Sequence, residues 1–461
     1  MRLLLSVLLG FWAACACALS SSGSRLLVVL EEEKSLYSTF WADLEGRGYD
    51  ITFESPKNEK LSLFDLGERA YDHVLILPPK SKGLGPALTP KLLIDFINKD
   101  GNVLLALSGK SPTSSAVSSL LLELDLHISP DRSSVVVDHF NYDVLSAAEK
   151  HDVLVLPRPS PPRADLKPYF AGDGVLAFPR PAAQSLGNAS PLLAPILRAP
   201  ETAYSYNVKE DAGSAEDSFA TGSQLSLVST LQGRNSARFT VLGSVEALED
   251  KWFSASVKGP NDKKASKTAN REFAKSVTAW TFQEIGVLKV GKVEHYLSDK
   301  EGNIQGEVNP IIYRIKNDIT FDIELSEYQF DKWVPYETVP EDEVQLEFTM
   351  LSPWHLLNLQ PKTRTENSTI YSTTFTSPDQ HGIFSFRVNY QRPYLTNVEE
   401  KHEITVRHFA HDEYPRSWKI TGGWVWIAGL WSVIGGFLAF VLVWLYSAPS
   451  PTAEAKIKKV N

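Results

Sequence analysis

The chain contains 461 residues, 43% of them apolar and 22% charged, which is ordinary for a globular protein of two or three folded units. Its 46 basic residues are outnumbered by 55 acidic ones, and the formal net charge of −9 disfavours nucleic acid as a partner. The only two cysteines are Cys15 and Cys17, which excludes a scaffold held together by many disulfides.

Residues 1–18 predict a signal peptide, because an apolar run from Leu3 to Ala14 follows an arginine and ends near a small-residue cleavage site at Ala16 and Ala18. An N-terminal membrane anchor is the alternative, but this run is shorter than the roughly 20 residues that span a bilayer. Both cysteines would leave with the signal, so we expect a mature chain without a thiol nucleophile.

Residues 25–156 predict an α/β domain with a doubly wound parallel sheet, because strands that are apolar on both faces alternate with helices. In the helix expected at 89–101, Thr89 is the predicted N-cap, Pro90 occupies the first turn and Gly101 is the predicted C-cap. The other elements are strands at 25–31, 49–55, 71–79 and 102–108 and a helix at 35–48.

Sheets of this kind bind ligands beyond the C-terminal ends of their strands, but no complete motif lies there. The stretch SGKS at 108–111 lacks the first glycine of a phosphate-binding loop, because Leu104 stands in its place. Ser108 also lacks the flanking glycines of a nucleophile elbow, and the glycines at 83–85 continue to Leu88 instead of a third glycine. We therefore assign no catalytic residue and no cofactor.

Residues 157–286 predict a middle region of Pro-rich loops and mixed α/β structure. A flexible linker is the alternative, but the region carries too many apolar residues for a solvated tether. Strands are expected at 225–232 and 237–244, and an amphipathic helix at 270–286. The side chains expected to face inward on this helix are Phe273, Val277, Trp280 and Phe282.

Residues 287–415 predict a membrane-proximal antiparallel β-sandwich, because short runs with a period of two are separated by turns. This fold usually serves as a binding or spacing module and does not by itself indicate catalysis. His408 and His411 could share a helix face and hold a metal, but on a strand they would point apart. We therefore expect no metal site and favour a collar at the membrane interface.

Residues 424–446 contain no charged side chain and predict a transmembrane helix with tryptophan and tyrosine near both ends. Small residues recur three or four apart along one face, which allows close approach of a second helix. The alternative is chance, because small residues are common in membrane helices. The predicted packing residues are Ala428, Ser432, Gly435, Gly436 and Ala439.

Residues 447–461 predict a short cytosolic tail, since a cleaved signal followed by one span places the body in the lumen. Lys458 and Lys459 are typical of the dilysine signal that returns proteins to the endoplasmic reticulum. The alternative is that the two lysines only flank the membrane and interact with it electrostatically. Asn188 and Asn367 begin glycosylation sequons, although Pro191 makes the first less favourable.

Most of the predicted mature chain resembles the forty-eight-kilodalton-type subunit of oligosaccharyltransferase, the wheat germ agglutinin-binding protein family of yeast. The stretches that carry this resemblance include RLLVVLEEEKSLYSTFWADLEGRGYDITF, GERAYDHVLILPP, DGNVLLALS, FAKSVTAWTFQEIGVLKV, YRIKNDITFDIELSEYQFDKWVPY, HGIFSFRVNYQRPYLTNVEEKHEITVRH and HDEYPRSWKITGG.

The resemblance implies a noncatalytic, single-pass type I subunit in the membrane of the endoplasmic reticulum. Such a subunit supports transfer of a preassembled glycan from dolichyl diphosphate to asparagine in nascent proteins. The implied partners are the catalytic multispanning subunit and subunits of the ribophorin II and defender-against-death types. A lumenal hydrolase or amidotransferase-like enzyme, or a sugar-binding cargo receptor, are the alternative functions.

Overall fold

The computed structural model describes residues 19–447 except 59, 81–82, 162, 188–189, 208–217, 300–302 and 415–421. The predicted signal peptide, Asn188 and the lysine pair at 458–459 lie outside the described residues. Contacts divide the chain into two compact units, Met1–Arg407 and His408–Asn461. The first unit contains both an α/β part and a β-sandwich, which are in contact with each other.

A nine-stranded mixed sheet forms the centre of the α/β part. Its first five strands are parallel, whereas the remaining strands add in an antiparallel sense. In spatial order they are β2 (Asp50–Glu54), β1 (Arg25–Val29), β5 (His73–Ile76), β6 (Asn102–Ala106), β15 (Arg238–Leu242), β14 (Leu225–Gln232), β11 (Gln184–Leu186) and β7 (Leu126–Ile128), with β12 (Leu193–Arg198) also on β14.

The expectation of an all-parallel sheet is therefore corrected to a mixed one. Strands β14 and β15, which we expected in a separate middle region, form a hairpin whose second strand pairs in parallel with β6. The hairpin is local in sequence, but its pairing with β6 joins segments more than one hundred residues apart. Periodicity predicts strands and gives no information on such distant pairing.

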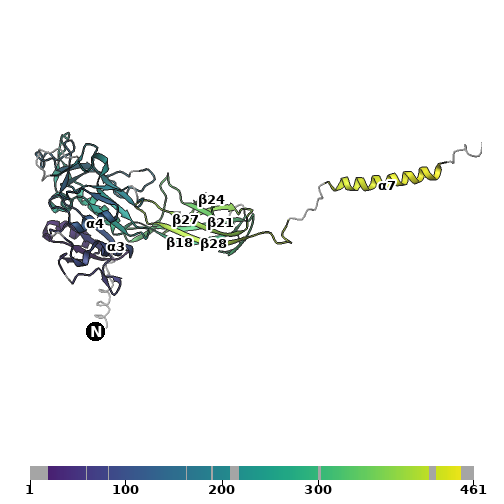
Figure 1. Cartoon of the computed structure of the whole chain (residues 1–461), viewed down its shortest axis with the longest axis horizontal. Helices are drawn as coiled ribbons and strands as arrows, with labels where there is room; N and C mark the ends of the chain where they lie inside the picture. The colour runs from purple at the N-terminus through teal and green to yellow at the C-terminus, as the bar shows by residue number, and fades with distance from the viewer. Residues whose placement is uncertain are drawn as a thin grey trace, which may run out of the picture. The chain divides into compact units, whose positions relative to one another are not determined.

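Helices cover both faces of this sheet. Two of them, α3 and α4, are labelled in Figure 1. The side chains of Leu27 and Val29 pack with those of α3 and α4, whereas Leu26 and Val28 face α2 and α6. The helices are α2 (Ser38–Glu45), α3 (Pro90–Asn98), α4 (Ser115–Glu123), the single turn α5 (Asp250–Phe253) and α6 (Asn270–Thr281). The four side chains predicted to face inward are all buried, although α6 ends at Thr281 instead of the predicted residue 286, so Phe282 is its C-cap.

The caps of α3 confirm one expectation and correct another. Thr89 is the N-cap, and its hydroxyl oxygen accepts the Leu92 N–H at 3.3 Å, with Pro90 in the first turn. The C-cap is Lys99 instead of the predicted Gly101. Asp100 adopts the left-handed conformation with φ 64°, which aspartate tolerates better than most residues.

Short elements complete the α/β part. They are β3 (Phe64–Asp65), β4 (Glu68–Arg69), β8 (Ser134–Val137), β9 (Val153–Pro157), β10 (Val175–Pro179), β13 (Tyr204–Asn207), β16 (Ser256–Val257), β17 (Ser266–Lys267) and the 3₁₀ turns η1 (Lys34–Tyr37), η2 (Pro86–Leu88), η3 (Gly222–Gln224) and η4 (Val245–Leu248).

The following segment forms two sheets of six and five strands. Their inner faces meet through aromatic rings, with Phe321 and Phe386 stacked at 5.3 Å and Phe348 at 5.0 Å from Phe375. The first sheet contains β19 (Ile304–Val308), β18 (Ile285–Ser298), β21 (Asp318–Gln329), β26 (Thr369–Thr376), β25 (Gln360–Arg364) and β22 (Lys332–Pro335). The second contains β20 (Ile312–Arg314), β28 (Val398–Arg407), β27 (Gly382–Tyr390), β23 (Gln345–Thr349) and β24 (Pro353–Asn358).

This β-sandwich agrees with the expected architecture, except that β20 joins β28 in parallel. In the second unit, α7 (Gly423–Tyr446) coincides with the predicted span to within one residue. By length and composition it is long and apolar enough to cross a membrane.

A buried histidine links the start of the described chain to the sheet. Asn102 Nδ2 lies 3.3 Å from His73 Nδ1, and His73 Nε2 lies 3.1 Å from the Gly23 carbonyl oxygen and 3.2 Å from Ser20 Oγ. The ring lies 4.9 Å from that of Phe282. Burial lowers the pKa of His73 to about 4, so the folded protein keeps this imidazole neutral.

We therefore expect the free energy of unfolding to decrease as the pH falls from 6.5 towards 4. The unfolded chain binds a proton at His73 in this window and the folded chain does not, which makes a difference of roughly 3 kcal/mol at most. Denaturant titrations of the full chain at several pH values measure the slope. His73→Gln should reduce it, and an unchanged slope in this variant would contradict the assignment.

Candidate functional site

Sheets of this kind usually bind ligands beyond the C-terminal ends of their parallel strands. In the described part of the chain, oppositely charged side chains pair with one another at this edge. Beyond β6, Lys110 Nζ lies 3.2 Å from the carboxylate of Glu246, which also pairs with the guanidinium of Arg180. Glu246 is only 2% exposed. Because its ammonium faces a carboxylate, Lys110 does not form a phosphate cradle.

Beyond β1 and β5, a second set of contacts fills the same edge. Glu31 accepts the backbone N–H of Lys80 at 2.6 Å and lies 3.4 Å from Lys57 Nζ. Tyr37 donates its hydroxyl to Glu32 at 3.0 Å, and burial together with this carboxylate raises the tyrosine pKa. The described residues contain no group of three histidine, cysteine, aspartate or glutamate side chains able to hold a metal.

Ser108 does not act as an exposed nucleophile in this arrangement. It is 7% exposed, and its Oγ accepts the backbone N–H of Lys110 at 3.1 Å. The gap that it lines together with Pro78 and Pro79 leaves room for about a single water molecule.

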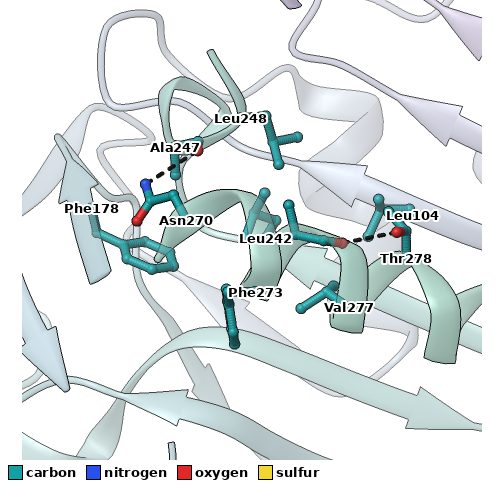
Figure 2. Close-up of a pocket in the computed structure, with 10 residues that line it drawn as sticks. Leu104, Phe178, Leu242, Ala247, Leu248, Asn270, Phe273, Val277 and Thr278 are labelled. Carbon is teal, nitrogen blue, oxygen red and sulfur yellow. Dashed lines mark hydrogen bonds between the residues drawn. The ribbon is translucent and has the colours of Figure 1, made fainter. Parts of the chain in front are cut away.

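A second gap lies between α6 and the sheet and is shown in Figure 2. Leu104, Leu242 and Phe273 line it, and it too has room for about one water molecule. The polar side chain at its rim, Asn270, is fully engaged. Its Oδ1 accepts the Ala177 N–H at 2.9 Å, and its Nδ2 donates to the carbonyl oxygens of Ala177 and Ala247 at 2.8 and 3.2 Å. We interpret this gap as a packing defect.

A wider cleft lies where the α/β part meets the β-sandwich. It encloses about 610 Å³, including its open mouth. Its lining residues come from β12 and the two residues before it, from β14, from α6 and from the loop between β27 and β28. They are Pro191, Leu192, Ala194, Thr230, Gln232, Trp280, Gln391, Arg392, Pro393, Tyr394 and Asn397. The joint between the two parts of the first unit is therefore the candidate functional site.

Arg238 is the central residue of this joint. Its side chain is fully buried and forms no ion pair with any described residue. Instead, the guanidinium donates to the carbonyl oxygens of Trp280, Ile285 and Gly286 and lies 4.6 Å from the Trp280 ring centre. Burial lowers its pKa to about 9. These bonds tie the first residue of β15 to the segment that enters the β-sandwich.

The loop between β27 and β28 completes the joint. Trp280 Nε1 donates to the Tyr394 carbonyl oxygen at 2.8 Å, and the Tyr394 hydroxyl donates to the Pro195 carbonyl oxygen at 2.7 Å. Thr396 donates its backbone N–H to Gly286 at 3.0 Å. Gly286 has φ +70°, and an added Cβ would lie 2.6 Å from the Tyr394 carbonyl oxygen. Glycine is therefore required at this position.

The segment around Pro168 in the α/β part also contacts the β-sandwich. Tyr169 donates its hydroxyl to Glu327 at 2.7 Å, and Lys167 forms an ion pair with the same carboxylate. Glu327 is 1% exposed, so its charge is compensated inside the joint. This attachment adjoins the Arg238 contacts, because Phe170 of the same segment packs against Trp280 and Tyr394.

The predicted packing residues of the span lie on one face of α7. At about 100° per residue, Ala428, Ser432, Gly435, Gly436 and Ala439 fall within an arc of about 100°. No residue of α7 is buried within the chain. The Ser432 hydroxyl donates to the Gly429 carbonyl oxygen at 2.7 Å, so this polar group is already satisfied inside the helix.

The sequon at Asn367 lies in the turn between β25 and β26. Asn367 is exposed, whereas Ser368 and Thr369 are each 3% exposed. Thr369 Oγ1 has no hydrogen-bond partner among the residues that the structure describes. The described structure therefore displays the acceptor asparagine and buries the hydroxyl residue of its sequon.

Sequence reasoning missed the residues of the joint. Arg238 precedes an apolar run, where a charged residue normally marks the exposed start of a strand. Its burial depends on carbonyl groups that lie more than forty residues away, for which the sequence carries no local signal. The only available indication was the apolar face of α6, which includes Trp280.

We predict that Arg238→Met lowers the stability of the full chain by about 3 kcal/mol, because buried carbonyl groups lose their donors. Thermal unfolding in detergent measures the loss as a lower Tm. Arg238→Lys keeps a charge but supplies fewer directed donors, so it should fall between the wild type and the methionine variant. An unchanged Tm for the methionine variant would show that the guanidinium is dispensable.

Comparison with known proteins places the chain in a family. Residues 17–284 match the family described as OST48, N-terminal domain, and residues 298–448 match the OST48 middle domain. The chain is 34% identical over 445 residues to the dolichyl-diphosphooligosaccharide–protein glycosyltransferase subunit wbp1 of Schizosaccharomyces pombe, covering 95% of each chain.

Two further relatives carry the name dolichyl-diphosphooligosaccharide–protein glycosyltransferase 48 kDa subunit. The one from Caenorhabditis elegans is 31% identical, with 95% of this chain and 94% of the relative covered. The one from Arabidopsis thaliana is 30% identical, with 92% of each covered. The chain belongs to the OST48 family.

Proposed function

We propose that this protein is a noncatalytic structural subunit of an oligosaccharyltransferase complex. It would support transfer of a preassembled glycan from dolichyl diphosphate to asparagine in nascent proteins. The observation that carries the noncatalytic role is the closed edge of the sheet, where Lys110 and Arg180 both pair with the buried carboxylate of Glu246. The names of the relatives support the assignment to this complex.

The joint supports a scaffold role. A subunit that positions other proteins must resist bending. The hydrogen bonds from Arg238 to three backbone carbonyl groups are buried and connect the two parts of the first unit. The α/β part and the β-sandwich would then present their surfaces at a constant spacing. The catalytic step would belong to a separate multispanning subunit.

We further propose that α7 anchors the protein in the membrane of the endoplasmic reticulum, with the first unit in the lumen and the tail in the cytosol. The small-residue face of α7 would contact a neighbouring helix. By resemblance, subunits of the ribophorin II and defender-against-death types are the nearest partners.

Affinity purification of the full chain in mild detergent, followed by a glycan-transfer assay, tests this function. The complex should transfer glycan to an acceptor peptide, and the chain purified alone should not. Hydrolase or transferase turnover by the isolated chain would overturn the noncatalytic role. Association that depends on glycans of bound cargo would instead favour a sugar-binding receptor.

We predict that the double variant Ser432→Leu and Gly436→Leu weakens contact with the neighbouring helix, because leucine keeps the two backbones apart. Recovery of the companion subunits in detergent should fall about tenfold, which corresponds to roughly 1.4 kcal/mol. Leu430→Phe adds bulk on the opposite face of α7 and should leave recovery unchanged. Equal recovery for all three proteins would remove the proposed helix contact.

We predict that replacing Lys458 and Lys459 by serine lets part of the protein leave the endoplasmic reticulum. Fluorescence microscopy and the glycan trimming state of a tagged full chain report this escape. The measurement requires cells in which the tagged chain exceeds its partners, since bound partners also retain it. Unchanged residence under these conditions would count against a retrieval signal.

A further inference from the structure

The β-sandwich has two ends, and the joint occupies one of them. At the joint, Tyr390 of β27 pairs with Val398 of β28, and the loop between these strands contacts the α/β part. At the opposite end, Gly382 of β27 pairs with Val406 of β28. Because β27 contains nine residues, the two ends are about 27 Å apart. We call the opposite end the distal end; it comprises residues 309–312, the loop 350–352 and the strand ends at 382 and 407.

Four exposed aliphatic side chains lie at the distal end. They are Leu351, Ile311, Ile383 and Ile312, which keep 98%, 74%, 65% and 57% of their surface in solvent. Side chains this exposed add little to the stability of the fold, since burial is the source of hydrophobic stabilisation.

Strand pairing holds three of these side chains close together. Ile312 of β20 and Ile383 of β27 both lie in register with Thr405 of β28, so they flank this strand on one face of the sheet. Two strand spacings place them about 10 Å apart. The Thr405 N–H donates to the carbonyl oxygen of Ile311 at 2.8 Å, which fixes this third residue beside them.

Leu351 lies at the same end, in the loop between β23 and β24. Thr349 of β23 pairs with Ser385 of β27, so the chain that follows runs towards the start of β27. A Cβ added at Gly382 would lie 2.7 Å from the sulfur of Met350, which places this loop directly beside β27. Single apolar residues are common on surfaces, whereas several at one end of a domain mark a protein or membrane contact.

The course of the chain indicates which of these two contacts is made. Strand β28 ends at the distal end with Arg407, and α7 begins sixteen residues later at Gly423. Helix α7 is long and apolar enough to cross a membrane, and a chain of sixteen residues spans at most about 58 Å. The chain therefore continues towards the bilayer from the end that exposes the aliphatic side chains, whereas the α/β part covers the other end.

The charges at the distal end also favour lipid over a charged partner. Lys316 Nζ lies 2.9 Å from the carboxylate of Asp379, which joins two loops of this end. On β28, Lys401 Nζ lies 2.7 Å from the carboxylate of Glu403. These opposite charges compensate one another, so an apolar contact needs no charged headgroup.

We propose that the distal end of the β-sandwich rests on the lumenal surface of the bilayer. Leu351 would enter the boundary between headgroups and acyl chains, with Ile311, Ile312 and Ile383 beside it. Apolar side chains at such an interface lie about 5–10 Å inside the headgroup region. The inference rests on the proposed anchoring by α7 and adds a second, peripheral contact between the first unit and the membrane.

Fluorescence from a single site tests the proposal, because the only cysteines, Cys15 and Cys17, lie in the predicted signal peptide. Leu351→Cys therefore gives the mature chain one thiol for an environment-sensitive fluorophore. The labelled full chain is reconstituted alone into phosphatidylcholine nanodiscs in which part of the lipid carries a nitroxide at the headgroup. Since a residue in the interface lies within the headgroup region, quenching of at least about twofold is expected.

Leu66→Cys is the matched control. Leu66 is a fully exposed leucine in the turn between β3 and β4 of the α/β part. The same fluorophore at this position should give equal emission with and without nitroxide lipid. Both labelled proteins should keep the wild-type Tm, because the replaced side chains are exposed.

A second variant tests whether the aliphatic side chains act together. With the fluorophore at Ile383→Cys, the added change Leu351→Glu should reduce quenching by about half, because a carboxylate is unfavourable among acyl chains. Leu66→Glu in the same labelled background should leave the quenching unchanged. Equal quenching with both glutamate variants would contradict a joint apolar contact.

The outcomes separate this inference from the proposed anchor. Quenching at residue 351 and not at residue 66 supports the membrane contact. No quenching at residue 351 in nanodiscs that contain the chain overturns it and leaves the anchor intact, whereas failure of the chain to enter nanodiscs contradicts the anchor itself. Shielding of residue 351 only after companion subunits bind would show that protein covers the distal end, which also overturns the inference.

Discussion

The buried guanidinium of Arg238 is the interaction on which the arrangement of the first unit depends. It has no carboxylate partner among the described residues, and three backbone carbonyl groups compensate its charge. Carbonyl groups of fixed geometry hold the guanidinium in one orientation, whereas a flexible acidic side chain could follow it. The contact therefore fixes the direction in which the chain leaves α6 and enters β18.

Under the proposed scaffold role, the joint would give the α/β part a purpose other than ligand binding. Its sheet has the topology that usually places a cofactor or substrate beyond the strand ends. Here Lys110 and Arg180 both pair with Glu246 at the same edge, and the gap beside Ser108 has room for about one water molecule. A fold that often carries an active site can thus serve as a rigid support once the edge is filled, because fold alone does not determine function.

Local elements were largely predictable from the sequence. The strand from Arg25, the helix capped by Thr89, the inward face of α6 and the span at 424–446 depend on neighbouring residues, so periodicity and capping patterns revealed them. The sheet order was not predictable, because the parallel pairing of β15 with β6 is decided by contacts between distant segments. Gly101 was also misassigned, since Asp100 supplies the left-handed residue after α3.

The candidate site was the least predictable part. The missing glycines around SGKS could be read from the sequence, whereas the joint carries no sequence motif. A buried arginine is unusual, and its sequence position resembles that of any charged residue beside a strand.

The buried hydroxyl of Thr369 sets an order of events for this chain. A transferring enzyme must reach the whole acceptor motif, and the threonine becomes inaccessible once β26 has paired with β21 and β25. Any sugar on Asn367 must then be attached while this hairpin is still open, during or soon after synthesis. A protein of this family would in that case be modified by an existing copy of the machinery that it later joins.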